Sequence, residues 1–265
     1  MRQHSLRWRL FLLVFAGTAL LSGSTVTSVF RKSLPMQADK SVVVENRNGN
    51  IEVRASIRDS IRIRADIEVK ARSEKEAKSV LENLNITVSQ EGGDVLIGAD
   101  YPRHAEGGDF WDWIFGRQVQ VQIRYAIDVP PKAAVNAKTT NGNVAVAGVE
   151  GRISAHATNG RVKVEKGSND VEAGVTNGSI TVTLSTVKKD GRVSLHTTNG
   201  SVRLILPADA KAEIDASTVN GGISTDFPVN VEGKFVGKRI RGTINGGGGE
   251  IDLKAVNGSI HIEKE

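Results

Sequence analysis

The sequence contains no cysteine and few aromatic residues. The absence of cysteine excludes disulfide bonds, lipid attachment to a cysteine and catalysis by a thiol nucleophile. Aromatic residues make up 5% of the chain, whereas glycine occurs 28 times. A core with so few rings has to be built from Val, Ile, Leu and Ala, which suits narrow and regularly layered strands. Composition therefore favours a mainly β protein that is held together by packing and backbone hydrogen bonds.

The one long apolar run extends from Leu10 to Leu21, which is short for a membrane-spanning helix of roughly 20 residues. Arginines precede the run and Ser22-Gly23-Ser24 follows it, a pattern typical of an export signal with small residues at its cleavage site. Residues 1–24 are therefore predicted to be a signal peptide, with an uncleaved N-terminal anchor as the alternative. A polar linker is expected over residues 25–40. For an exported chain without cysteine we expect a bacterial cell envelope, in the periplasm or at the cell surface, with any membrane association made through the N-terminal segment.

A strong charge imbalance is also missing. The net charge is +5 at pH 7, and the predicted signal peptide supplies three of the basic residues. The remaining acidic and basic residues are nearly balanced and interspersed along the chain. The sequence therefore gives no compositional support for a nucleic-acid partner.

What the chain has in abundance is the Asn-Gly pair, which occurs eight times. Six of the pairs lead into an alternating polar and aliphatic stretch, the pattern of a half-buried strand that follows a tight turn. Between residues 141 and 220 the pairs are 18, 18, 22 and 21 residues apart, and a second alternating strand precedes each later pair. Two strands per repeat with turns at fixed places predict a parallel β-solenoid, in the manner of a single-stranded β-helix. The alternative is a sandwich in which Asn-Gly merely closes unrelated hairpins.

Stacked coils would place equivalent corners above one another. The side-chain amides of the corner asparagines would then form a hydrogen-bonded ladder, and the preceding threonines a parallel column of hydroxyls. These positions are Asn141, Asn159, Asn177 and Asn199, with Thr140, Thr158, Thr176 and Thr198. Because hairpin turns alone would not require the threonine, the recurring Thr-Asn-Gly favours the solenoid.

Residues 41–131 are predicted to form a β-rich region that leads into the repeats over residues 132–265. Ser73 followed by Glu76 is a capping-box pattern, and apolar residues at helical spacing follow it. The only helix is therefore expected at about residues 74–84. Its apolar stripe should lie against a sheet face or an end of the solenoid.

An aromatic loop over residues 107–117 stands out, because aromatic residues are otherwise scarce. Its four rings are Phe110, Trp111, Trp113 and Phe115. One interpretation is that the loop folds back to cover an open end of the solenoid. The other is an exposed tip that contacts a membrane interface, a glycan or a protein partner.

Candidate chemistry is sparse. His156 and His196 each lie three residues before an Asn-Gly, with Gly174 at the equivalent position of the intervening repeat. Two histidines two strands apart are separated by about 10 Å, which is too far for one metal ion. No repeated acidic cluster is present for glycoside hydrolysis. We therefore expect no catalytic residues, no metal and no cofactor.

These features resemble a family of bacterial adhesin-like proteins, domain of unknown function 4097. The resemblance rests on the four Thr-Asn-Gly corners and on the segments 73–102 and 119–142, and it covers roughly residues 41–265. It implies an exported β-solenoid that acts as a non-catalytic envelope protein, an adhesin or binding scaffold for an envelope protein, a glycan or a cell surface. An accessory or sensor protein of an envelope-stress signalling system is the alternative, followed by a polysaccharide-active enzyme. Fold alone does not decide among these functions.

Overall fold

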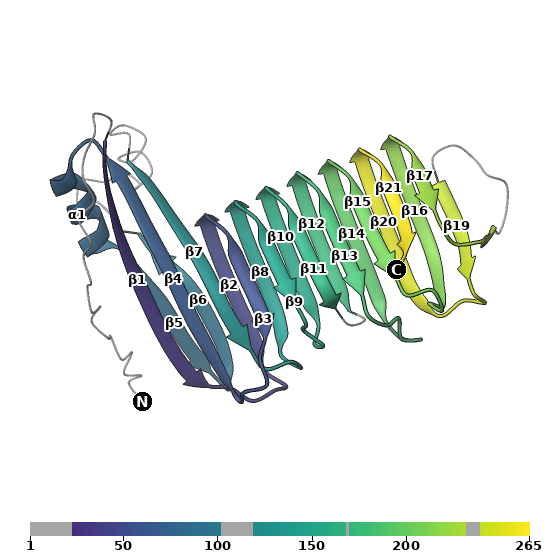
Figure 1. The fold of residues 1–265 in the computed structure, drawn as a ribbon, viewed down its shortest axis with the longest axis horizontal. Coiled ribbons are helices and arrows are strands. Elements are labelled where there is room, and N and C mark those ends of the chain that lie inside the picture. The colour runs from purple at the N-terminus through teal and green to yellow at the C-terminus, as the bar shows by residue number, and fades with distance from the viewer. Residues whose placement is uncertain (1–22, 102–118, 168–169, 232–238) are drawn as a thin grey trace.

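The computed structural model describes most of the chain, namely residues 23–101, 119–167, 170–231 and 239–265 (Figure 1). This part is mainly β and contains a single α-helix. The expected signal peptide lies outside the described residues apart from Gly23 and Ser24, and the expected aromatic loop lies outside them entirely.

Two large sheets make up the fold. Sheet A contains ten strands, in the spatial order β1 (Ser24–Pro35), β4 (Ser60–Ala71), β7 (Gln120–Val129), β3 (Ile51–Ala55), β9 (Val144–Ala147), β11 (Val162–Gly167), β13 (Ile180–Leu184), β15 (Val202–Leu206), β21 (Ile260–Lys264) and β17 (Ile223–Thr225). Sheet B contains eleven strands, in the order β18 (Val229–Val231), β19 (Arg239–Ile244), β16 (Ala212–Asn220), β20 (Gly249–Asn257), β14 (Arg192–Asn199), β12 (Val171–Asn177), β10 (Ile153–Asn159), β8 (Ala134–Asn141), β2 (Ser41–Asn48), β6 (Asp94–Asp100) and β5 (Asn85–Glu91).

The middle of both sheets is parallel and built from repeated coils. Each coil sends one strand into sheet B, turns at an Asn-Gly corner and sends the next strand into sheet A, as β10 and β11 do. The predicted solenoid is thus confirmed as two large, mostly parallel sheets in a solenoid-like arrangement. Antiparallel strands complete the ends, with β1 and β4 at one edge of sheet A and β18 and β19 at one edge of sheet B.

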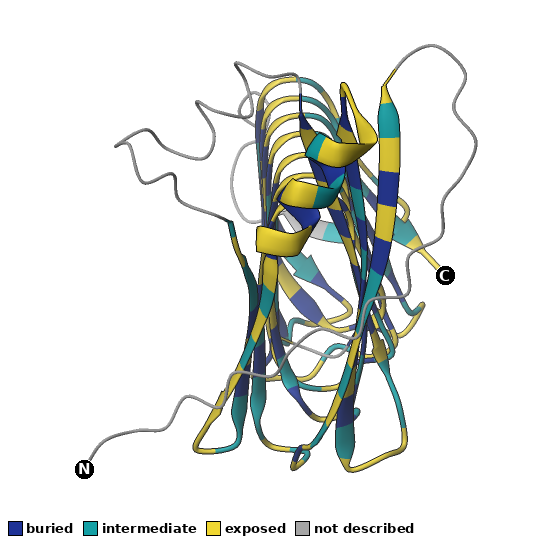
Figure 2. Cartoon of the chain, turned by 90° about the vertical axis from the view of Figure 1, so that its left-hand side faces the viewer, coloured by how far each residue is buried: buried dark blue, intermediate teal, exposed yellow. Residues whose placement is uncertain are grey.

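The core lies between the two sheets, which Figure 2 shows edge-on with the buried residues facing one another. Neighbouring coils place like residues in register, so that Ile153 lies beside Val171 and Ala155 beside Ala173, all of them buried. Burying one Val or Ile side chain stabilises a fold by roughly 1.5–3 kcal/mol. A single coil has no partner for its aliphatic face, and stacking supplies one.

Helix α1 (Glu74–Asn83) lies at the end of the molecule near β1 and β4 (Figures 1 and 2). It begins where the sequence predicts, since the Ser73 hydroxyl accepts a hydrogen bond from the Glu76 backbone N–H at 3.3 Å. Its buried residues are Ala77, Val80 and Leu81. The apolar stripe therefore faces the end of the core, which agrees with one of the two placements expected from sequence.

The expectation of a linker over residues 25–40 is wrong. Strand β1 pairs along its whole length with β4, from Ser24 opposite Ala71 to Pro35 opposite Ser60. Val26 is buried, and Phe30 packs partly buried against the core. The physical reason is that β4 would otherwise leave its backbone donors and acceptors unpaired along one edge.

The order of the coils also departs from the order of the chain. The C-terminal coil, β20 and β21, lies between the coil of β14 and β15 and the coil of β16 and β17. At the other end, β2 and β3 join the parallel stack through β8 and β9. Strands from both predicted regions, before and after the boundary expected at residues 131 and 132, therefore lie side by side in each sheet. One hydrophobic core runs through both regions.

Candidate functional site

The Asn-Gly corners form a continuous ladder of side-chain hydrogen bonds. Asn159 Nδ2 donates to Asn141 Oδ1 at 2.8 Å, and Asn177 Nδ2 donates to Asn159 Oδ1 at 2.9 Å. The ladder is longer than the four asparagines singled out from sequence, because the insertion of the C-terminal coil adds further members. In spatial order it consists of Asn48, Asn141, Asn159, Asn177, Asn199, Asn257 and Asn220.

The corners are not the hairpin turns for which Asn-Gly is best known. In those turns both residues take positive φ, whereas here the ladder asparagines do not, and six of the seven glycines that follow them do, with Gly221 as the exception. Gly178 has φ of +144°, and a Cβ at this position would overlap the carbonyl oxygen of Gly160 on the next coil. Glycine is required because the backbones of stacked corners approach closely, and asparagine because its side chain builds the ladder.

A second set of hydroxyls, which the sequence analysis missed, lies inside the corners. Thr139, Thr197 and Thr218 are buried two positions before a ladder asparagine. Their hydroxyls donate to glycine carbonyls of neighbouring corners at 2.8 to 3.1 Å. For Thr139 and Thr197 the doubled threonine of Thr-Thr-Asn-Gly is the available signal, since alternation turns the first threonine inward, whereas Thr218 is followed by Val219 and lacks this signal.

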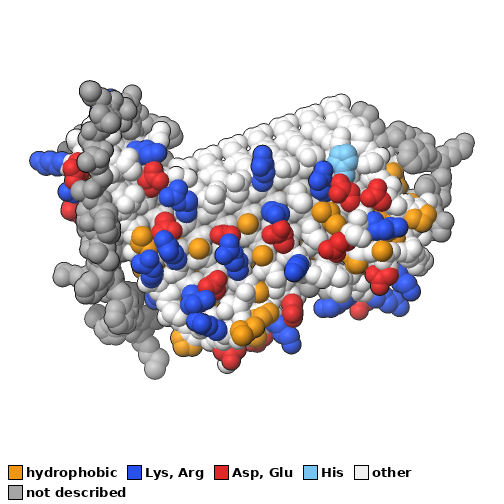
Figure 3. Space-filling view, viewed as in Figure 1, with side chains coloured by type: hydrophobic (Ala, Val, Ile, Leu, Met, Phe, Trp, Pro, Cys, Tyr) orange, Lys and Arg blue, Asp and Glu red, His pale blue; other side chains and the backbone are white. Residues whose placement is uncertain are grey.

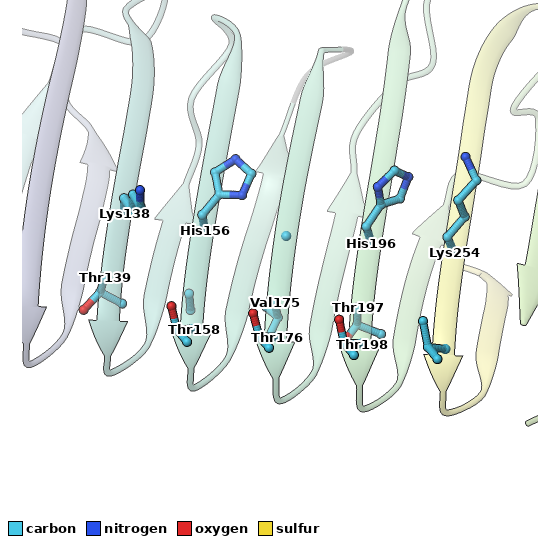
Figure 4. Close-up of a pocket in the computed structure, with 13 residues that line it drawn as sticks. Lys138, Thr139, His156, Thr158, Val175, Thr176, His196, Thr197, Thr198 and Lys254 are labelled. Atoms are coloured by element: carbon cyan, nitrogen blue, oxygen red, sulfur yellow. The ribbon is translucent and has the colours of Figure 1, made fainter. Parts of the chain in front are cut away.

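The threonines that the sequence analysis did single out form an exposed row on the outer face of sheet B. Thr140, Thr158, Thr176 and Thr198 are all exposed, one per coil. Figure 4 shows the last three side by side along successive strands. They are therefore surface residues, whereas the inner threonines carry the bonds between corners.

Next to this row an open groove of about 440 Å³ crosses the strands of sheet B. Its upper side in Figure 4 is a second row of residues, each three positions before a ladder asparagine. Strand register places these residues in the order Lys138, His156, Gly174, His196 and Lys254. The column of two histidines around a glycine that the sequence predicts is thus present.

The two imidazoles are held in similar ways. His156 Nε2 lies 3.1 Å from the hydroxyl of Ser154, and His196 Nε2 lies 3.4 Å from that of Ser194. His196 Nε2 is also 3.4 Å from Asp252. The ring of His156 lies over Gly174. A Cβ added to that glycine would be only 2.6 Å from His156 Nδ1, so the ring occupies the space of the missing side chain.

Carboxylates around the groove are engaged in ion pairs. Asp252 accepts a hydrogen bond from Lys254 Nζ at 2.6 Å. One strand further, Asp215 binds Arg239 and Arg241. The hydrogen bond from Arg239 is the main cause that lowers the pKa of Asp215 to about 2, and Arg241 adds to it.

Other candidate sites receive little support within the described residues. There, no three His, Asp or Glu side chains gather closely enough to hold a metal ion. No helix in the same ranges combines the length and the apolar character that a membrane span requires. On the face in Figure 3, Lys and Arg are interspersed with Asp and Glu instead of forming one basic patch. The predicted site at Phe110, Trp111, Trp113 and Phe115 lies outside the described residues.

Among solved structures, the chain is similar to a "putative cell adhesion protein" from Clostridium sporogenes ATCC 15579. The two are 11% identical with a TM-score of 0.47, and the match covers 90% of this chain and 100% of that chain. It is also similar to a "putative adhesin" from Bacteroides fragilis NCTC 9343, at 12% identity and a TM-score of 0.36, over 90% of this chain and 97% of that chain. Likenesses at this level carry no argument about function. No curated protein matches the chain.

The family comparison is more extensive. The family model described as Toastrack DUF4097 matches residues 32–263, which include both sheets almost completely. This match confirms the resemblance drawn from the Thr-Asn-Gly corners. The chain belongs to the Toastrack DUF4097 family.

Proposed function

We propose that this protein is an exported, non-catalytic binding scaffold of the bacterial envelope, of the adhesin type, and that the outer face of sheet B is its binding surface. The observation that carries the proposal is the strict register of the coils. Register turns each outward position into a straight row of side chains, such as the row from Lys138 to Lys254. A partner that repeats along its length can meet such a row at several points at once, which raises its overall affinity.

Rigidity supports the same role. Every coil in the middle of the stack is bonded on both sides through its backbone and through a ladder asparagine, as Asn177 is to Asn159 and Asn199. A surface that is ordered before binding loses less conformational entropy when the partner binds.

Export is supported by the sequence. The basic start, the apolar run and the small residues within residues 1–24 match a signal segment, and the chain without cysteine needs no disulfide chemistry to fold. The same segment left uncleaved would tether the scaffold to the membrane.

The test is to produce the full chain with a C-terminal tag in a bacterium and to fractionate the cells. We expect the protein in the envelope fraction or the medium, and we expect the purified protein to co-sediment with isolated envelopes. Recovery from the cytoplasm alone, together with no sedimentation above a control protein, would contradict the proposal.

The aromatic loop has its own test. If its rings contact the partner, replacing Trp111 and Trp113 with Ala abolishes envelope binding and leaves the melting temperature nearly unchanged. If the rings cover an end of the core instead, the same double variant melts at a markedly lower temperature, because large apolar groups are lost from packing.

A further inference from the structure

We infer that the groove on sheet B binds an acidic polysaccharide, with the sugar chain lying across the strands along the row from Lys138 to Lys254. This inference rests on the proposed function and names the class of its ligand. Three properties of the groove support it: its shape at Gly174, its charge and its hydroxyl row.

The shape of the groove depends on Gly174. The residues on the neighbouring strands in the same row, His156 and His196, carry rings, whereas Gly174 carries no side chain. The space that a side chain would take at Gly174 is filled by the His156 ring, so that between the two histidines a ligand meets the edge of this ring. His156 Nε2 interacts with the Ser154 hydroxyl, and its Nδ1 lies over Gly174. A polar ring atom at the floor of an open groove is suited to hydrogen bonding with a ligand hydroxyl or carboxylate.

The charge of the groove favours an anion. Its lining contains Lys138, Lys254 and two histidines, and no Asp or Glu. The nearest carboxylates lie outside the lining. Asp252 is paired with Lys254. Glu172, two residues before Gly174 on the same face, is paired with Arg152. Glu45 lies in register beside Lys138. The lining itself has a lysine at each end and no carboxylate, and although Asp252 offsets part of the charge of Lys254, this arrangement complements a chain that carries repeated negative charges.

The hydroxyl row favours a sugar over other anionic polymers. Thr158, Thr176 and Thr198 present one exposed side chain per strand along the groove. Threonine both donates and accepts hydrogen bonds, as sugar hydroxyls do. Single-stranded nucleic acids bind by stacking on aromatic side chains, and the lining contains no Phe, Tyr or Trp. A peptide strand adds to the edge of a sheet, and this groove crosses a sheet face.

The length of the row sets the length of the ligand. Lys138 and Lys254 are four strand spacings apart, which corresponds to about 19 Å. A single sugar cannot reach both lysines, so affinity should rise with chain length until the row is filled.

The experiment is calorimetric titration of the full chain with three probes of equal chain length: polygalacturonate, neutral dextran and single-stranded DNA. We expect polygalacturonate to bind, and to bind more weakly as salt is added. Neither of the other two polymers should bind with comparable affinity. If dextran or DNA binds as well as polygalacturonate, the groove does not recognise an acidic sugar and the inference is overturned.

Two variants locate the site. Gly174→Glu displaces the His156 ring and adds a negative charge, and Lys138→Glu reverses one end of the row while the ring stays over Gly174. Each should weaken polygalacturonate binding by about tenfold or more, the equivalent of losing one favourable charged contact. Lys163→Glu is the matched control, since Lys163 is equally an exposed lysine but lies in β11 of sheet A. Melting curves of all three variants identify any that fail to fold.

The outcomes separate the inference from the proposed function. If the wild-type chain sediments with envelopes but does not bind polygalacturonate, the proposed scaffold function is supported and the acidic-polysaccharide inference is wrong. If polygalacturonate binding falls as much in Lys163→Glu as in Lys138→Glu, the sugar binds elsewhere and the groove assignment is overturned. Loss in both groove variants, with Lys163→Glu unchanged, supports the site.

Discussion

Replacing Asn177 with Ala should destabilise the protein measurably although the side chain is exposed. Asn177 lies in the middle of the corner ladder. Its Nδ2 donates to Asn159 Oδ1 at 2.9 Å, and its Oδ1 accepts from Asn199 Nδ2 at 2.8 Å. Alanine removes both bonds and leaves the two neighbouring amides without their partner, so the change interrupts the ladder at its centre.

The magnitude follows from the number of bonds. One intramolecular hydrogen bond contributes about 0.5–1.5 kcal/mol net, and exposed bonds lie in the lower half of that range. Two such bonds give a loss of about 1–2 kcal/mol in the free energy of unfolding. For a domain of this size, 1 kcal/mol corresponds to about 2–4 °C, so the melting temperature should fall by about 2–8 °C.

The chain supplies a matched control in the same motif. Asn220 lies at the end of the ladder and donates to Asn257 at 2.8 Å. It stands to lose one ladder bond where Asn177 loses two, so Asn220→Ala should cost about half as much. Urea denaturation, followed by circular dichroism, measures both variants under one condition. A loss in Asn177→Ala no larger than the loss in Asn220→Ala would refute the reasoning, because the ladder would then contribute nothing by its continuity.

Two further changes test the corners and one edge of sheet B. Gly178→Ala should cost more than the loss of two ladder bonds, because its Cβ would overlap the carbonyl oxygen of Gly160 at φ of +144°, and a stability near wild type would show that the corners are not tightly stacked. The depressed pKa of Asp215 means that its bonds to Arg239 and Arg241 stabilise the fold above the ordinary carboxyl pKa of 3.8 and are lost as the pH falls toward about 2. Melting temperatures of wild type and Asp215→Asn should therefore differ at neutral pH and converge at acid pH, and a constant difference would contradict the assignment.

The parallel stack could be predicted because its signals are local and repeated. Each Thr-Asn-Gly corner is followed by alternating residues such as Val162 and Val164, and the burial of these residues confirms the alternation. Helix α1 was predictable for the same reason, since Ser73 and the apolar spacing after it lie within one short segment.

The features that sequence reasoning missed depend on partners that are distant in the chain. The segment of β1 is polar in sequence and follows the signal, which predicts a linker, and nothing local reveals its pairing with β4. The structure buries only Val26 and Ser28 along this strand. The position of the C-terminal coil between two earlier coils could not be predicted either. Each coil carries the same Asn-Gly corner, so the sequence does not indicate which coils are neighbours. The groove could be outlined from His156, Gly174 and His196, but Lys254 joins their row only through the inserted coil.

The stacking order of the corners can be measured directly, because the chain contains no cysteine and engineered pairs would be its only thiols. Neighbouring strands are about 4.8 Å apart and can be joined by a disulfide, whereas strands two places apart, at about 10 Å, cannot. His196→Cys with Lys254→Cys should therefore form an intramolecular disulfide on mild oxidation, and His196→Cys with Ser217→Cys should not. A disulfide in the second pair and none in the first would place the corners in chain order, and would remove Lys254 from the row on which the proposed binding surface depends.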